Sequence, residues 1–151
     1  MITKRLAGLT LFFLAGLIPP LAVAADPCIN PVSSVELSEC EISRAARAEK
    51  AMTSSYQQLQ RGLAKIEAEF VKTYPTLPPI SLKAKLVAAQ REWLKFRTQS
   101  CGLESQVVFA GNPSRGDRPS QVQTSCEAAM AQARSIQLKT LAKQYEIDLA
   151  Q

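Results

Sequence analysis

Residues 34–72 read SVELSECEISRAARAEKAMTSSYQQLQRGLAKIEAEFVK, and this segment predicts one long α-helix. Its apolar side chains recur mostly every three or four residues, which is the spacing of one helix face. They are Val35, Ile42, Ala45, Met52, Tyr56, Leu59, Leu63, Ile66 and Phe70. A seam sustained over so many turns is typical of a helix that packs lengthwise against other helices. Ser33 or Ser34 is expected to cap the first turn, and Glu36 stands at the capping-box position if the cap is Ser33.

Prolines separate this helix from a second one. Pro75, Pro78 and Pro79 cannot continue a helix and form a stiff connector. Ser81 is then expected to cap a helix that runs to about Cys101. One face of that helix carries Leu82, Leu86, Ala89, Trp93 and Phe96.

A third helix is predicted over residues 120–149, after a loop of roughly eighteen residues at 102–119 that contains several glycines and prolines. Its seam carries Leu138, Leu141 and Tyr145. Short connections make neighbouring helices antiparallel. The predicted fold class is therefore all-α, an antiparallel three-helix up-down-up bundle with disulfides at one pole.

The first 24 residues have the composition of a secretion signal. Two basic residues are followed by an apolar run at 6–18, by two prolines, and by small residues at 22–24 that suit a cleavage site. The apolar run is too short for a good transmembrane helix. We therefore predict a cleaved signal over 1–24 and one helical domain over 25–151, periplasmic or secreted, with no membrane span after cleavage.

The four cysteines, Cys28, Cys40, Cys101 and Cys126, all belong to the same end of the predicted bundle. An even set in a small exported domain indicates disulfides. A zinc site lacks its usual ligands, since the chain has no CxxC pair and no histidine. We favour Cys28 with Cys40 and Cys101 with Cys126, because both closures are local. The crossed pairings remain open.

Composition argues against several classes of function. The expected mature chain has 16 basic and 13 acidic residues, a net charge of +3 that is spread along the helices. Such a mild, dispersed excess does not favour nucleic-acid binding. The chain has no histidine base, no glycine-rich phosphate loop and no closely spaced carboxylate pair. We expect a protein that is not an enzyme and has no catalytic residue, cofactor or metal.

The segment AQREWLKFRTQSC, residues 89–101, places Gln90, Trp93 and Arg97 on one helix face. One interpretation makes Trp93 part of the core, with Arg97 lying over it and paired nearby. The alternative is a surface recognition patch, because tryptophan and arginine are favoured anchors in interfaces.

Two charged residues fall on the apolar seams of the other helices. Glu49 lies on the first seam and Arg134 on the third. At 1.5 Å per residue, Glu49, Arg134 and Trp93 each lie about 12–13 Å from the nearest helical cysteine. We therefore expect one layer in which Glu49 contacts Arg134 or Arg97, since an unpaired buried charge is costly.

The predicted loop carries an apolar tripeptide, Val107, Val108 and Phe109. Such a tripeptide either packs onto the bundle or is offered to a partner. If the protein has a protein partner, we expect these residues and the neighbouring end of the bundle, which carries the cysteines, to contact it.

These features together resemble the LprI family of lysozyme inhibitors, specifically its N-terminal-type domain, over residues 28–141. The residues that carry the resemblance are Cys28, Cys40, Ala48, Glu49, Met52, Thr53, Tyr56, Gln90, Trp93, Arg97, Cys101, Cys126, Arg134 and Leu138. Glu49 and Thr53 replace the family's usual aspartate and asparagine, and Thr98 replaces an aspartate. The matched residues other than cysteine, among them Tyr56, look like bundle scaffolding.

The resemblance implies an envelope protein that binds and inhibits a lysozyme or related muramidase. Two alternatives stay open: an envelope interaction or structural module that inhibits nothing, and an immunity protein against a secreted wall-degrading toxin. Many lysozymes are basic, so a net charge of +3 gives no long-range steering toward them. Local acidic patches would be needed for that.

Overall fold

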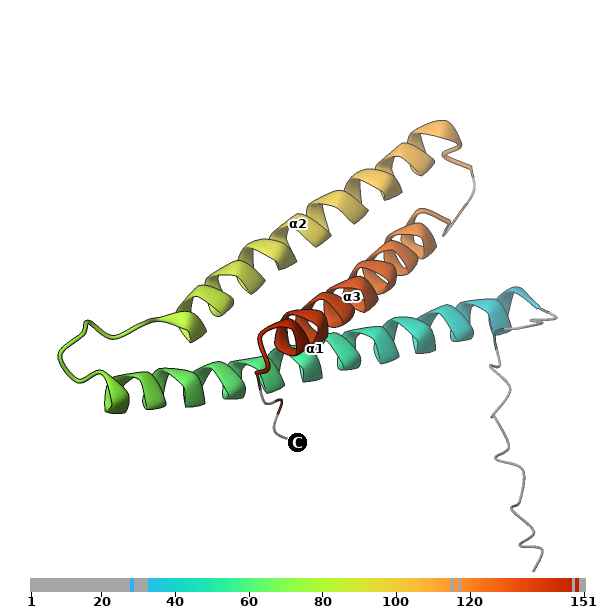
Figure 1. Ribbon diagram of the computed structural model, residues 1–151. Helices are drawn as coiled ribbons and strands as arrows, with labels where there is room; N and C mark the ends of the chain where they lie inside the picture. The colour runs from blue at the N-terminus through green and yellow to red at the C-terminus, as the bar shows by residue number, and fades with distance from the viewer. Residues whose placement is uncertain (1–27, 29–32, 115, 117, 148, 150–151) are drawn as a thin grey trace, which may run out of the picture.

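The computed structural model describes Cys28, residues 33–114, Gly116, residues 118–147 and Leu149. The predicted signal segment, residues 1–24, lies outside these ranges. The elements are α1 (Ser34–Thr73), α2 (Leu82–Gly111) and α3 (Arg118–Gln144), which run up, down and up. This confirms the predicted all-α bundle. Figure 1 shows α3 lying between α1 and α2, which diverge from their shared connector toward the opposite end.

The ends of α1 agree with the sequence. Ser33 is the N-cap, and its hydroxyl oxygen accepts a hydrogen bond of 3.1 Å from the backbone N–H of Glu36. At the other end, the backbone N–H of Tyr74 donates to the carbonyl of Phe70 at 2.8 Å. Pro75 follows at once and cannot continue the helix. Local capping and proline chemistry therefore set both boundaries.

The predicted boundary of α2 was wrong at its C-terminal end. The helix does not stop near Cys101 but continues to Gly111, so residues 102–111 are helical and only 112–117 connect it to α3. Gly102 is tolerated because one glycine inside a helix costs only about 1 kcal/mol. The backbone N–H of Asn112 closes the last turn, and Pro113 then prevents continuation.

The start of α2 also differs in detail. Ser81 occupies the N-cap position, as predicted, but its side chain makes no capping hydrogen bond. The backbone N–H of Lys83 instead donates to the Glu67 carboxylate of α1 at 2.7 Å. A carboxylate at a helix N-terminus is favourable both as an acceptor and through the helix dipole. The cap of α2 thus comes from another helix.

The third helix ends at Gln144, five residues before the predicted limit. Glu146 adopts a left-handed backbone conformation with φ of 51°. The N–H of Ile147 donates to the carbonyl of Ala142 at 2.9 Å, and that of Glu146 to Lys143 at 3.3 Å. This is a Schellman ending, in which the residue after the left-handed one packs back on the helix. Ile147 accordingly packs against the core.

The core lies where all three helices overlap. Its buried cluster consists of Leu59, Leu63, Leu86, Leu138 and Ala142. Several residues predicted on the apolar seams are exposed instead: Val35, Ile42, Ile66, Phe96, Leu141 and Tyr145. For Val35 and Ile42 the reason is geometric, because α1 is longer than α3 and diverges from α2, so its N-terminal end extends past the helix that covers its middle.

Small polar side chains let α1 and α3 approach closely at the centre. The buried hydroxyl groups of Ser55 and Ser135 lie 2.9 Å apart, and the carbonyl oxygen of Ala51 lies 2.8 Å from the first and 3.2 Å from the second. Because each hydroxyl has one proton, one of them donates to the carbonyl and the other donates to its neighbouring hydroxyl. Each buried hydroxyl is therefore satisfied, as burial of a polar group requires. None of the helices in the described ranges combines enough length with enough apolar character to cross a membrane.

Both disulfides have the local pairing that we favoured. Cys28 pairs with Cys40, with a Cα–Cα distance of 5.4 Å, and Cys101 pairs with Cys126 at 5.5 Å. The first fastens the segment before α1 to that helix, and the second joins α2 to α3. Neither disulfide joins α1 to another helix, so α1 is held in the bundle by packing and polar contacts.

Candidate functional site

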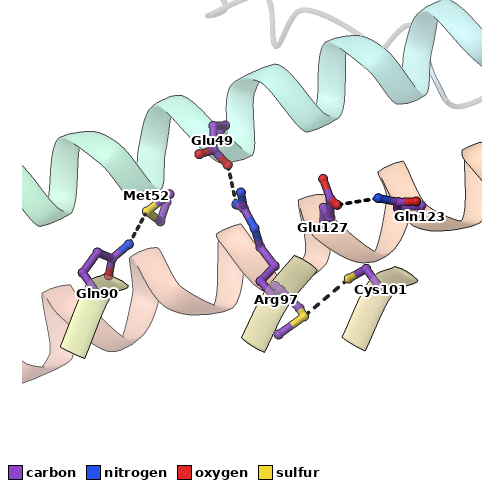
Figure 2. A network of polar contacts seen from close by, with 8 residues as sticks. Glu49, Met52, Gln90, Arg97, Cys101, Gln123 and Glu127 are labelled. Carbon is purple, nitrogen blue, oxygen red and sulfur yellow. Dashed lines mark hydrogen bonds and ion pairs between the residues drawn. The ribbon is translucent and has the colours of Figure 1, made fainter. Parts of the chain in front are cut away.

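A half-buried polar layer joins the three helices. Arg97 of α2 donates to the carboxylate of Glu49 on α1 at 2.6 Å, as Figure 2 shows. The Arg97 side chain is 13% exposed and the Glu49 side chain 49% exposed. The prediction that Glu49 contacts Arg97 or Arg134 is therefore confirmed, with Arg97 as the partner.

Trp93 lies at the centre of this layer. The guanidinium carbon of Arg97 is 5.2 Å from the centroid of its ring, and that of Arg134 is 5.6 Å away. Both distances are within the range of cation–π attraction. Trp93 itself is only partly buried. Arg97 lies over the indole and pairs with a nearby carboxylate, as the first interpretation of residues 89–101 expected, but Trp93 is not among the buried residues of the core.

Gln90 links the layer to all three helices. Its side-chain nitrogen lies 3.1 Å from the sulfur of Met52 on α1 (Figure 2). Its side-chain oxygen accepts a hydrogen bond from Arg134 on α3 at 3.0 Å. Arg134 also donates to Gln137 at 2.6 Å. Burial lowers the pKa of the Arg134 guanidinium, but arginine starts so high that it stays charged at neutral pH.

The remaining predicted motif residue, Tyr56, packs against the core, and its hydroxyl accepts from Gln60 at 2.9 Å. One contact of this region was not predicted: the sulfur of Met130 lies 3.6 Å from the sulfur of Cys101. Methionine suits an irregular space beside a disulfide. Gln90, Arg97 and Arg134 thus connect neighbouring helices, whereas the bond between Gln60 and Tyr56 lies within α1.

An open cleft lies at the end of the bundle that carries the cysteines. We call this end the cysteine pole: residues 33–49 of α1 with its cap, 97–111 of α2 and 118–130 of α3. The cleft has a volume of about 920 Å³ and lies among all three helices. Its lining includes Leu37, Glu41, Ile42, Glu104, Arg118 and Val122. The Ser125 hydroxyl donates to Glu41 across the α1–α3 side at 3.1 Å.

The apolar tripeptide was wrongly placed in a loop, because it forms part of the last turns of α2. Helix formation does not bury it: Val107 is 64% and Phe109 is 54% exposed, and Val108 is partly buried. Val107 and Phe109 therefore lie exposed on the helix that borders the cleft, whereas Val108 is turned partly toward the bundle.

Charge is distributed unevenly between the two ends of the molecule. The described residues of the cysteine pole include six acidic and four basic side chains, a net charge of −2. The rest of the described chain has eleven basic and four acidic side chains, a net charge of +7. The positive charge of the protein thus lies outside the cysteine pole, which is itself slightly acidic. We call the rest of the described chain, residues 50–96 and 131–147, the basic pole.

The fold and the layer define a class: a small all-α domain crosslinked by two disulfides, in which the densest polar cluster is scaffold. Among the residues that the structure describes, no group of histidine, cysteine, aspartate and glutamate side chains is placed to hold a metal ion. The family model for "Lysozyme inhibitor LprI" matches residues 28–138. The chain belongs to this family, which confirms the resemblance.

This match includes all four cysteines and every residue of the polar layer. The family is one of inhibitors and not of enzymes, and its name implies a lysozyme as partner. Two disulfides also suit an extracellular or periplasmic setting, where oxidising conditions preserve them. No curated protein and no solved structure matches the chain.

Proposed function

We propose that this protein is exported to the periplasm or the cell exterior and inhibits a lysozyme or related muramidase by binding it through the cysteine pole. The observation that carries the proposal is the open, partly apolar cleft, lined by two glutamates and one arginine, at that pole in a member of a lysozyme-inhibitor family. The cleft supplies concave surface, which ligand and partner sites generally require.

Electrostatics favour this end of the molecule over the other. Many lysozymes are basic, and an interface gains specificity and association rate when opposite charges face each other. Glu39, Glu41 and Glu104 lie at the cysteine pole, and the last two line the cleft. The rest of the described chain, with its net charge of +7, would repel a basic enzyme. The uneven charge thus supports an oriented approach despite the positive net charge.

Apolar contacts are also available at this pole. Ile42 of α1 and Val107 and Phe109 of α2 are all more than half exposed. Because a helix already fixes the backbone of these residues, binding need not order it, which lowers the cost of association. The disulfide between Cys101 and Cys126 further limits movement of α2 against α3. These residues are the anchors that we assign to the interface.

The test is a cell-wall lysis assay with a basic lysozyme and purified mature protein with intact disulfides. We expect lysis to slow as the protein is added, with stoichiometric inhibition at high enzyme concentration. If the enzyme is bound without any loss of activity, the protein is an interaction module and the inhibitor proposal fails. If lysozymes are unaffected but a toxin muramidase from neighbouring cells is inhibited, the protein is an immunity protein.

A further inference from the structure

The connector between α1 and α2 forms an apolar tip at the end opposite the cysteine pole. We call residues 70–80 the connector tip. Val71, Tyr74 and Leu77 are each about half exposed. The ring of Tyr74 packs at 5.2 Å from that of Phe70, and the N–H of Leu77 donates to the carbonyl of Tyr74 at 3.0 Å. In Figure 1 this tip lies beyond the end of α3, which leaves its apolar side chains uncovered.

The backbone of the tip is suited to an apolar surface. Pro75, Pro78 and Pro79 have no N–H group, and the N–H groups of Tyr74 and Leu77 are already bonded. An unbonded N–H is costly where water is absent, so a segment with few of them is easier to insert shallowly. The prolines also stiffen the segment, so little conformational entropy remains to be lost.

Lysines outnumber carboxylates beside the tip. Lys72, Lys83 and Lys85 are exposed on the flanking turns, against Glu67 and Glu69. Glu69 pairs with Lys72 at 3.6 Å and Glu67 caps α2, so Lys83 and Lys85 supply the positive charge at the tip. An apolar tip with a tyrosine at its edge and lysines behind it has the composition of a surface that settles at an anionic bilayer.

We propose that the connector tip docks this protein on a membrane surface that contains anionic phospholipid, with Val71, Tyr74 and Leu77 at the headgroup level. Charge complementarity selects the lipid: the half of the molecule that carries the tip has a net charge of +7. The acidic cysteine pole is repelled by the same surface, so the docked molecule stands with that pole outward. Because α1 has 40 residues, the pole would project about 60 Å from the membrane.

The test is vesicle co-sedimentation of the mature protein at low salt. One set of vesicles contains phosphatidylcholine mixed with phosphatidylglycerol, whose anionic headgroups give the surface a negative potential, and the other is pure phosphatidylcholine. We expect at least tenfold stronger partitioning into the anionic vesicles. The variants Tyr74→Ser with Leu77→Ser, and Lys83→Gln with Lys85→Gln, should each reduce it at least tenfold.

Phe96→Ser is the matched control, because Phe96 is a similarly exposed apolar residue on α2 away from the tip. It should change partitioning less than twofold. The proposal is overturned if the wild type does not prefer anionic vesicles, or if Phe96→Ser is as harmful as the tip variants. It is also overturned if the variant Tyr74→Ser with Leu77→Ser partitions like the wild type. That result would mean that charge alone binds the protein to the vesicles and that the apolar tip does not contribute. A tip-dependent dimer in sedimentation velocity without lipid would assign the surface to a second copy and likewise overturn it.

Discussion

Arg97 and Glu49 form an ion pair of 2.6 Å that joins α2 to α1, although 48 positions separate them in the chain. The disulfides hold α2 to α3 and the N-terminal segment to α1, but neither joins α1 to α2. The pair therefore supplies a cross-helix link that no covalent bond provides. Its position beside Trp93 also fixes the guanidinium over the indole.

We predict that Glu49→Ala lowers the free energy of unfolding by about 1–2 kcal/mol, because it leaves a mostly buried guanidinium without this acceptor. The loss is smaller than for a fully buried pair because the Glu49 side chain is half exposed. Glu92→Ala is the control, since its pair with Lys95 is exposed on both sides. It should change stability by less than about 0.5 kcal/mol. Equal melting of Glu49→Ala and the wild type would contradict the role of the layer.

The two disulfides should differ in their contribution to stability. Replacing Cys101 and Cys126 together with alanine removes a crosslink of sequence separation 25 between two helices. Replacing Cys28 and Cys40 removes one of separation 12 that fastens only the N-terminal segment. Chain-entropy estimates predict losses in the free energy of unfolding of about 3.5 kcal/mol for the Cys101–Cys126 disulfide and about 3 kcal/mol for the Cys28–Cys40 disulfide. The second loss should be smaller still, because that disulfide fastens only the N-terminal segment. Urea unfolding would measure both, and a larger loss from the second pair would contradict this account.

Gly102 is predicted to limit the stability of α2. A Cβ atom added there meets nothing within 4 Å, and the residue lies in the helix interior. Gly102→Ala should therefore raise stability by about 0.5–1 kcal/mol. Gly116→Ala is the contrasting variant, because Gly116 has φ of 60°, a conformation that alanine adopts with strain. Thermal melting should move in opposite directions for the two variants, and a loss of stability for Gly102→Ala would show that α2 is not continuous there.

Acidic residues of the cysteine pole should matter for binding a basic lysozyme. Glu39→Gln with Glu104→Gln is predicted to lower the association rate about threefold at 50 mM salt, because both carboxylates are exposed at this pole. The difference should shrink at 300 mM salt as screening shortens the range of the attraction. Glu92→Gln, at the basic pole, should have little effect in a surface-binding measurement. An equal effect of Glu92→Gln would indicate that only the net charge matters.

Much of the fold could be predicted because the informative signals were local. Ser33 and Pro75 set the ends of α1, and the helical rise was enough to place Glu49 near Trp93 and Arg97. The disulfide pairing followed from nearness in the chain. The contact between Glu49 and Arg97 could be expected because a charge on a helix seam needs a partner.

The errors arose where the outcome depends on neighbouring elements. The sequence around Gly102 has turn-forming residues, but continuous hydrogen bonding outweighs one glycine, so the helix extends to Gly111. Ile42 and Phe96 follow the seam period, yet no helix covers them, because periodicity gives a face but not the length of its partner. The cleft and the acidic pole form only when three separate helix ends are brought together.

The inhibition constants of wild type, Phe109→Ser and Phe96→Ser, measured in a muramidase assay, bring the proposed activity and its surface into one experiment. Phe109 lies at the cysteine pole, and Phe96 lies about 20 Å away along α2, while both are more than half exposed. We predict that the wild type inhibits the muramidase. Phe109→Ser should weaken inhibition at least tenfold, about 1.4 kcal/mol, with an unchanged melting temperature. The inhibition constant of Phe96→Ser should stay within about twofold of that of the wild type. Absence of inhibition by the wild type, or equal weakening by the two variants, would contradict the account.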